Sequence, residues 1–99
     1  MTEICVNVVK RRGHVLVAAC DSNILGKRLK HGTLTFEVLP SFYDGARVKL
    51  GEAIRLIRGA TTANLVGTLI VERAVKEGLV HPQAVIRISG VPHAQIVRL

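Results

Sequence analysis

Two apolar runs near the start of the chain predict a β-hairpin. Residues 4–9 are apolar except at Asn7, and residues 14–20 are apolar after His14. The segment between them ends in Gly13, which can adopt the positive φ that a hairpin turn requires. Because apolar side chains occupy both faces of both runs, we expect two inner strands that are covered on two sides.

The next stretch is polar and basic, and it predicts a connection. Residues 21–32 read DSNILGKRLKHG. We expect one helical turn at most in this connection, capped at its start by Asp21 or Ser22 and ended by Gly26.

A strict alternation of apolar and polar residues follows in residues 33–38 and predicts a half-buried strand. One face of this strand carries the apolar side chains of Leu34, Phe36 and Val38. Pro40 ends the strand. Residues 42–48 predict a turn around Asp44 and Gly45, which short strands can flank.

Two helices are predicted in the centre of the chain. Residues 49–58 have the period of an amphipathic helix that ends at Gly59, with an apolar stripe made by Leu50, Ala53, Ile54 and Ile57. A second helix is expected over residues 61–77, capped by a threonine at its start and followed by Gly78. Since residues 63–71 are apolar on almost every side, this helix should be the central one.

The last part of the chain predicts two more strands. Residues 84–88 alternate, residues 89–93 (SGVPH) form a connector that contains Gly and Pro, and residues 94–99 form a final strand. The resulting order is β-β-β-α-α-β-β. We therefore expect an α+β fold in which two helices pack on a mainly antiparallel sheet, as a single domain over residues 1–99.

Length and hydropathy narrow the class of protein. The chain has 99 residues, of which 48% are hydrophobic, and its mean hydropathy is positive, so an ordered core is expected. No apolar run approaches the roughly 18 residues of a membrane span, and the N-terminus lacks the basic and apolar regions of a signal peptide. These features predict a cytoplasmic protein with no membrane partner.

The net charge of +7 favours a polyanionic partner. Residues 10–31 hold +5 of this charge, with Asp21 as their one acid and six basic residues: Lys10, Arg11, Arg12, Lys27, Arg28 and Lys30. Either these residues are simply solvated, or they contact the phosphates of a nucleic acid. The intervening strand carries the chain roughly 20 Å, at about 3.3 Å per residue, so the two clusters form one patch only if the connection folds back.

The aromatic residues bear on how RNA would be bound. Phe36, Phe42 and Tyr43 are the only ones in the chain, and Phe36 is expected in the core. Base stacking needs exposed rings. We therefore expect phosphate contacts to a structured RNA, such as ribosomal RNA or a ribonucleoprotein, and a role on the ribosome, in its assembly or in translation.

The relation between the two cysteines depends on the hairpin turn. A two-residue loop of Arg12 and Gly13 would pair Cys5 with Cys20, whereas a three-residue loop would pair Cys5 with Ala19. We favour the three-residue loop, because a two-residue type I′ turn would place an arginine at positive φ. No disulfide is then expected, in keeping with a reducing compartment. Two isolated cysteines without a CxxC spacing do not predict a zinc site, and we expect no metal or cofactor.

Two other classes of function stay open. An enzyme could use Cys20, Asp21 and His93 as nucleophile, orienting acid and base, although no nucleophile elbow or oxyanion loop is visible. The simpler interpretation is that Cys20 is a buried, inert thiol and that Asp21 caps a helix. A protein-interaction module that uses a sheet edge or a helical face is the third hypothesis.

Three polar residues in the C-terminal half of the chain are candidates for a binding pocket or for a structural contact. His93 and Gln95 follow Gly90 and Pro92, which restrict the backbone. We expect His93 to form hydrogen bonds within the connector, with ligand or RNA contact as the alternative. Asn64 falls in the predicted central helix, and a buried amide there needs partners. We expect it to pack against the segment of His93 and Gln95.

Several of these stretches together resemble a known family. LVAACD with a following LGK, then FYDG, ATTANLVG and ISGVPHAQIVRL are similar to small archaeal proteins that are classed only as a domain of unknown function, number 424. The resemblance covers about residues 15–99 and is most specific at ANLVG (63–67) and GVPHAQ (90–95). It implies an archaeal, cytoplasmic origin, and it carries no catalytic role that could be transferred.

Overall fold

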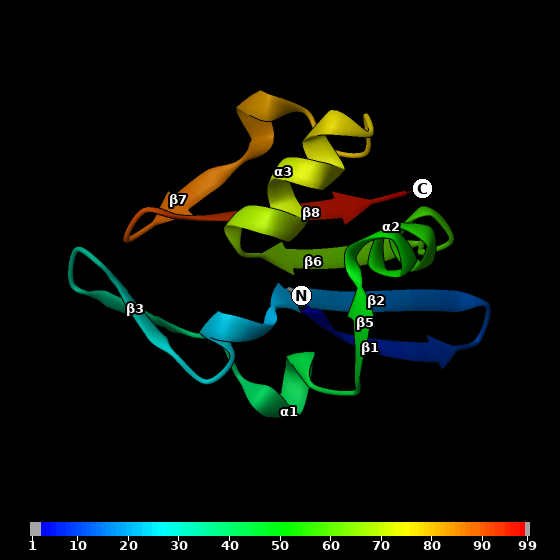
Figure 1. Ribbon diagram of the computed structural model, residues 1–99, viewed down its shortest axis with the longest axis horizontal. Helices are drawn as coiled ribbons and strands as arrows, with labels where there is room; N and C mark the ends of the chain where they lie inside the picture. The colour runs from blue at the N-terminus through cyan, green and yellow to red at the C-terminus, as the bar shows by residue number, and fades with distance from the viewer. Residues whose placement is uncertain (1–2, 99) are drawn as a thin grey trace.

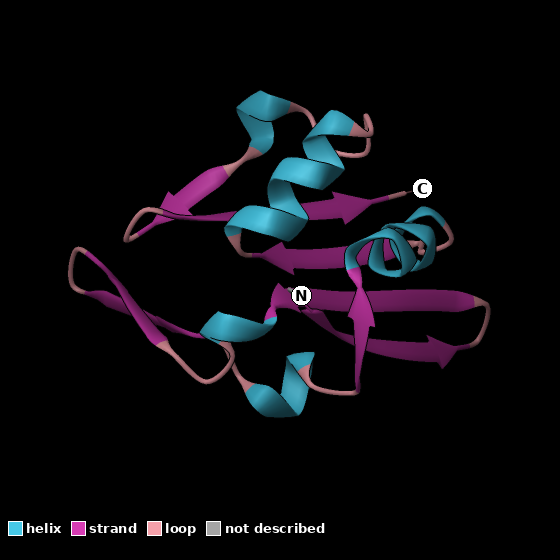
Figure 2. Cartoon of the chain, in the orientation of Figure 1, coloured by secondary structure: helices cyan, strands magenta, loops and turns pink. Residues whose placement is uncertain are grey.

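The computed structural model describes residues 3–98, and its N-terminal part is the predicted hairpin (Figures 1 and 2). Strands β1 (Glu3–Arg11) and β2 (His14–Asp21) pair in antiparallel fashion along their length. Their valine-rich sequences suit extended backbone whose two faces are both covered.

The turn of this hairpin differs from the prediction. Arg11 pairs with His14, so the loop has two residues, and both have positive φ, 52° at Arg12 and 80° at Gly13. The expected three-residue loop is therefore wrong. A type I′ turn matches the right-handed twist of the strands, and this gain outweighs the roughly 1–2 kcal/mol that a left-handed residue costs.

Four further strands complete a six-stranded sheet within the described residues. Its order is β5-β1-β2-β6-β8-β7, where the added strands are β5 (Ala46–Lys49), β6 (Thr62–Val66), β7 (Ile86–Ile88) and β8 (Val91–Val97). Neighbouring strands are antiparallel except for the parallel pair β2 and β6. The expected α+β fold on a mainly antiparallel sheet is confirmed.

Two helices, α2 (Leu50–Arg58) and α3 (Thr68–Lys76), cover one face of the sheet (Figure 1). The predicted stripe of α2 is confirmed: Ala53, Ile54 and Ile57 are buried against the sheet, and Gly59 caps the helix. Among the described residues, no helix has the length and apolar character to cross a membrane.

The opposite face of the sheet is covered in part by shorter elements. These are a second hairpin, a short helix and a 3-10 turn: β3 (Arg28–His31), β4 (Leu34–Glu37), α1 (Pro40–Tyr43) and η1 (Ser22–Ile24). Leu29 of β3, Tyr43 of α1 and Val38, which follows β4, bury Cys5 and Cys20 in a second core. The prediction that the two N-terminal strands are covered on both sides is confirmed for residues 4–6 and 17–20, whereas Val8 and Val9 nearer the turn are exposed.

The predicted central helix over residues 61–77 is wrong in its first half. Thr62–Val66 is strand β6, between β2 and β8, and only Thr68–Lys76 is helical. An all-round apolar segment suits either a buried helix or a strand covered on both faces, and periodicity alone does not separate the two. Gly67, at φ 122°, makes the break between strand and helix.

Other boundaries also differ from the prediction. The basic connection contains strand β3, because residues 28–31 pair with β4 to form the second hairpin. The expected turn around Asp44 and Gly45 is present, with the short helix α1 before it and strand β5 after it, so a strand flanks it on one side only. The full order is therefore β1-β2-β3-β4-α1-β5-α2-β6-α3-β7-β8, with 3-10 turns at η1 and at η2 (Pro82–Ala84).

The C-terminal strands are confirmed with changed limits. Ser89 and Gly90, both at positive φ, make a tight turn between β7 and β8. Most of the predicted connector is therefore strand, since β8 begins at Val91 and includes His93. Leu99, the end of the predicted last strand, lies outside the described residues.

Candidate functional site

The first basic cluster lies at the turn between β1 and β2. Lys10, Arg11 and Arg12 are exposed, and His14 beside them is exposed as well. Within the described part of the chain, no acidic group lies within ion-pair distance of these three cations. Their charge is therefore free to act on a partner.

The second basic cluster lies on and just before β3. Lys27, Arg28 and Lys30 are exposed. The Nε atom of Arg28 lies 3.5 Å from Oε1 of Glu37 on the paired strand β4. This pair is highly exposed, so it contributes little to stability.

The two clusters do not form one patch. The turn between β1 and β2 and the hairpin that carries β3 lie at opposite ends of the molecule (Figure 1), whose longest extent is 37 Å. Strand β2 leads from the first turn toward the middle of the molecule, and η1 and the second hairpin continue away from that turn (Figure 1). The alternative of two separate contacts therefore holds.

Several other arginines already have partners. Arg55 donates to both carboxylate oxygens of Glu52, and Arg58 and Arg73 both bind Glu77. Hydrogen bonds from these two arginines lower the pKa of Glu77. These charges are therefore less available to an external anion than those of the two clusters.

Arg98 has a structural role that the sequence did not indicate. Its guanidinium donates to the carbonyl oxygens of Ile57, Arg58 and Ala60, at and beyond the C-terminal end of α2. A cation at this end satisfies carbonyls that have no partner within the helix. Only the return of β8 to the end of α2 brings the two together.

The aromatic rings offer no exposed stacking platform within residues 3–98. Phe36 packs edge-on against His93 with ring centroids 5.4 Å apart, and Phe42 packs against Tyr43 at 4.9 Å. Phe36 and Phe42 are half-buried and Tyr43 is buried. The expectation that Phe36 belongs to the core is confirmed in part, since it packs against the second core cluster.

The three candidate catalytic residues do not converge. Cys20 pairs with Val66 on β6, and Val66 pairs in turn with His93 on β8. Cys20 and His93 are therefore two strands apart, roughly 10 Å at 4.8 Å per strand, with a valine between them. Asp21 follows Cys20 along the strand and so faces the other side of the sheet.

The two cysteines are directly opposite each other across β1 and β2. The expected pairing of Cys5 with Ala19 is wrong, because the two-residue turn shifts the register by one position. Both thiols are free and fully buried. Burial raises the pKa of Cys5 and raises that of Cys20 to about 12. Because the thiolate is the reactive form, these are inert side chains at neutral pH.

Asp21 is a helix cap, but of a distant helix. Its two carboxylate oxygens accept hydrogen bonds from the backbone N–H groups of Leu69 and Ile70, at 2.9 and 3.0 Å, in the first turn of α3. The expectation that it caps the turn at residues 22–24 is wrong, as its side chain makes no such bond there. Burial raises the pKa of Asp21, against the lowering effect of the two backbone hydrogen bonds.

Asn64 and Gln95 form a cross-strand amide pair. They are register partners on β6 and β8, and Nε2 of Gln95 donates to Oδ1 of Asn64 at 3.0 Å. The expected packing of the segments 63–67 and 90–95 is thus confirmed, although Asn64 lies in a strand and is half-buried.

His93 lies beside this pair but outside it. Its ring contacts Phe36, and within the described residues it makes no side-chain hydrogen bond. The expected hydrogen-bonding role in a connector is therefore wrong. His93 is a residue of strand β8, and its ring packs against Phe36 of the second hairpin. Partial burial lowers its pKa.

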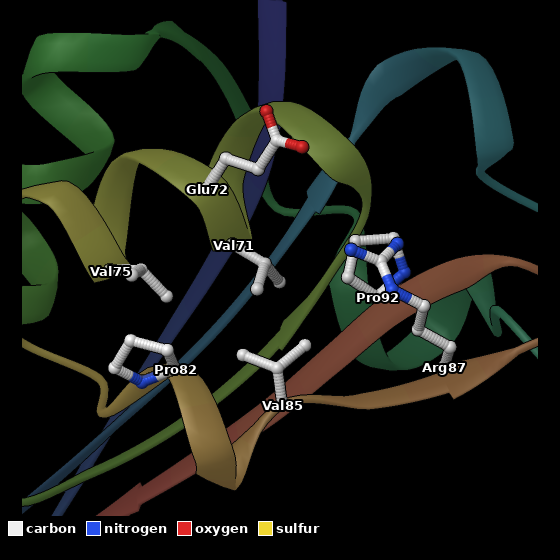
Figure 3. Close-up of a pocket in the computed structure, with 7 residues that line it drawn as sticks. All are labelled: Val71, Glu72, Val75, Pro82, Val85, Arg87 and Pro92. Atoms are coloured by element: carbon white, nitrogen blue, oxygen red, sulfur yellow. The ribbon is translucent and has the colours of Figure 1, made fainter.

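A small cleft opens between α3 and β7 (Figure 3). The cleft has a volume of about 170 Å³, and its charged members are Glu72 and Arg87. Its floor is apolar and is formed by Val71, Val75, Pro82, Val85 and Pro92. Sites for drug-sized ligands have roughly 300–1,000 Å³, so this cleft is smaller than such sites.

Over residues 3–98, no group of three or more His, Cys, Asp and Glu side chains is placed to hold a metal ion.

Comparison with known proteins confirms the resemblance. Residues 9–99 match the family described as "Protein of unknown function (DUF424)". The fold is similar to the crystal structure of an uncharacterized conserved protein from Methanopyrus kandleri, with a TM-score of 0.82 and 27% sequence identity over 98% of this chain and 94% of that chain. No curated protein matches the sequence.

Proposed function

Since the chain belongs to the family described as "Protein of unknown function (DUF424)", whose description gives no activity, we propose a function from its surface: the protein binds structured RNA through phosphate contacts at its two basic ends. The observation that carries the proposal is the free charge of these ends. Of the six basic residues in the two clusters, only Arg28 has an acidic partner within residues 3–98.

The distance between the clusters supports a folded RNA as the partner. Two contacts at opposite ends of a body 37 Å long require phosphates that a rigid nucleic acid holds at a matching separation. The packed aromatic rings argue against a single strand read by base stacking. We infer that the partner is ribosomal RNA, or a ribonucleoprotein in ribosome assembly or translation, in an archaeal cytoplasm.

A filter-binding titration across salt concentrations tests the proposal, with folded ribosomal RNA and a duplex RNA oligonucleotide as probes. Each phosphate contact contributes roughly 0.9 to the slope of log K against log salt. The variant Arg11→Glu should weaken binding and reduce the magnitude of this slope by roughly 0.9, the value of one phosphate contact. Lys27→Glu should do the same at the other end.

The matched control is Lys76→Glu, which makes the same charge change at an exposed position of α3. It should change the slope little. An affinity that is the same at low and high salt would overturn the proposal. So would binding that survives joint reversal of Arg11, Arg12, Lys27 and Arg28.

A further inference from the structure

An apolar groove lies between the second hairpin and the end strand β7. It has a volume of about 300 Å³ and is lined by His31, Leu34, Thr35, Phe36, Ile86 and Ile88. None of the candidate residues from the sequence belongs to it. The alternation of residues 33–38 predicts Leu34 on the buried face of its strand, and this expectation is wrong, because Leu34 is exposed at the groove.

The two walls of the groove expose large aliphatic side chains. Leu34 is 70% exposed and Ile86 is 59% exposed, and they stand on separate elements that both face the groove. Two such side chains at one groove mark an interaction surface more than scattered exposure does. A partner that covers them removes this apolar area from water.

The groove is held open by a link between its walls. The Oγ atom of Ser89, in the turn after β7, donates to the carbonyl oxygen of Lys30 on β3. Phe36 contacts His93, which pairs directly with Ile86. The second hairpin is therefore joined at two points to the β7–β8 pair, so little ordering is needed when a partner binds.

Strand β7 also offers an unpaired backbone edge. It pairs with β8 on one side and is the last strand of the sheet in the described residues. Exposed edges accept an added strand, whose alternate side chains then enter neighbouring pockets. An extended segment that pairs with β7 would direct every second side chain toward Ile86 and Ile88, on the side of the groove.

The charge beside β7 bears on the chemistry of the partner. Arg87 lies between Ile86 and Ile88 on this strand, so its side chain points to the opposite face and lines the cleft with α3. Glu72 also lines this cleft, but within residues 3–98 it forms no ion pair with Arg87. The one acid on β3, β4 and β7 is Glu37, which pairs with Arg28. An added strand that directs apolar side chains into the groove places its alternate side chains on the face of Arg87, and this charge complements acidic ones.

We propose that this groove binds an extended segment of a partner protein in which apolar side chains alternate with acidic ones. The apolar side chains occupy the space between Leu34 and Ile86, and the acidic ones lie on the opposite face of the added strand, on the side of Arg87. This inference uses none of the basic side chains of the two clusters, and it does not depend on RNA binding there.

Nuclear magnetic resonance titration of the full chain tests the proposal. The probe is a short synthetic peptide in which Val alternates with Glu, and the control peptide has Lys in place of each Glu. The Glu peptide should shift the amide resonances of residues 34–36 and of Ile86–Ile88, and the Lys peptide should bind at least several-fold more weakly. Leu34→Ser should weaken binding of the Glu peptide roughly tenfold through lost apolar contact.

A second variant and a matched control make the test independent of folding. Ile86→Thr keeps a β-branched residue in β7 and should weaken peptide binding in the same way. Val97→Thr changes an equally exposed side chain, at 66%, outside the groove and should leave binding unchanged. The proposal is overturned if neither peptide shifts the groove, if both bind equally, or if the groove variants have no effect. It is also overturned if duplex RNA, and not the Glu peptide, shifts the groove resonances.

Discussion

The carboxylate of Asp21 occupies the space that a side chain at position 67 would need. A Cβ atom added to Gly67 would lie 2.6 Å from Oδ1 of Asp21, far inside contact distance. The same carboxylate accepts the N–H groups of Leu69 and Ile70. The end of β2 thus both holds the first turn of α3 and requires glycine before it.

Gly67→Ala should therefore destabilise the protein strongly. The substitution creates the clash with Asp21 and places alanine at φ 122°, and together these should lower the free energy of unfolding by about 2–4 kcal/mol. Urea denaturation measures the change. Gly51→Ala is the control, since nothing lies within 4 Å of a Cβ there, and it should add about 0.5–1 kcal/mol to stability in α2. Equal effects of the two substitutions would contradict this account.

Removal of the carboxylate itself should also be costly. Asp21→Ala leaves two N–H groups of α3 without a partner in a buried place, and we expect a loss of about 2–3 kcal/mol. Asp21→Asn keeps one acceptor oxygen and should lose less. The measurement is again urea denaturation, with the exposed Asp44→Ala as control. Stability unchanged in Asp21→Ala would show that α3 does not need this cap.

The hairpin turn offers a stabilising substitution. Arg12 has a φ of 52° in a two-residue turn, where asparagine before glycine is the preferred sequence. Arg12→Asn should raise the free energy of unfolding by roughly 0.5–1 kcal/mol. Arg11→Asn removes the same charge from a strand position and should give no such gain. Thermal and urea denaturation of both variants decide between the two-residue turn and the longer loop.

The buried thiols should be unreactive in the native protein. Cys5 and Cys20 are both 0% exposed, and burial raises the pKa of Cys20 to about 12. Alkylation by iodoacetamide at neutral pH should be at least roughly a hundredfold slower than in urea. A native thiol that reacts as fast as the unfolded one would revive Cys20 as a nucleophile.

His93 should make stability depend on pH in the acid range. Its pKa in the folded protein lies below the ordinary value of 6.5, because burial disfavours the charged ring. As pH falls through this window, the unfolded chain binds a proton that the folded chain resists, so the free energy of unfolding decreases. Urea midpoints at about pH 7.5 and 5.5 measure this. His93→Gln should reduce the dependence, whereas the exposed His14→Gln should retain it.

The sequence predicted correctly the elements whose structure follows from the apolar pattern of a single segment. The runs around the first hairpin and the stripe of α2 were recognised because period 2 and period 3.6 are properties of the segment itself. The packing of Asn64 against the segment 90–95 was also expected, through the two segments that carry the family resemblance, but its pairing with the side chain of Gln95 was not. The function of the basic residues stays a prediction.

The sequence was ambiguous where a segment is apolar all round or polar all round. The sequence predicts a helix over residues 62–66 and a connection over residues 28–31, and both segments are strands. Neither segment has a period that identifies its structure. The first is a strand because β2 and β8 supply hydrogen bonds on both of its edges. The second is a strand because β4 pairs with it.

By itself, then, the sequence determined the class of fold, the inner strands, the amphipathic helix and the excess of positive charge. Only the tertiary structure decided that the two basic clusters lie at opposite ends, that Cys20 and His93 do not meet, and that Asp21 caps α3. It also decided that Leu34 and Ile86 share an open groove. The physical reason is common to these four: each depends on contacts between residues far apart in the chain, and no local period records such contacts.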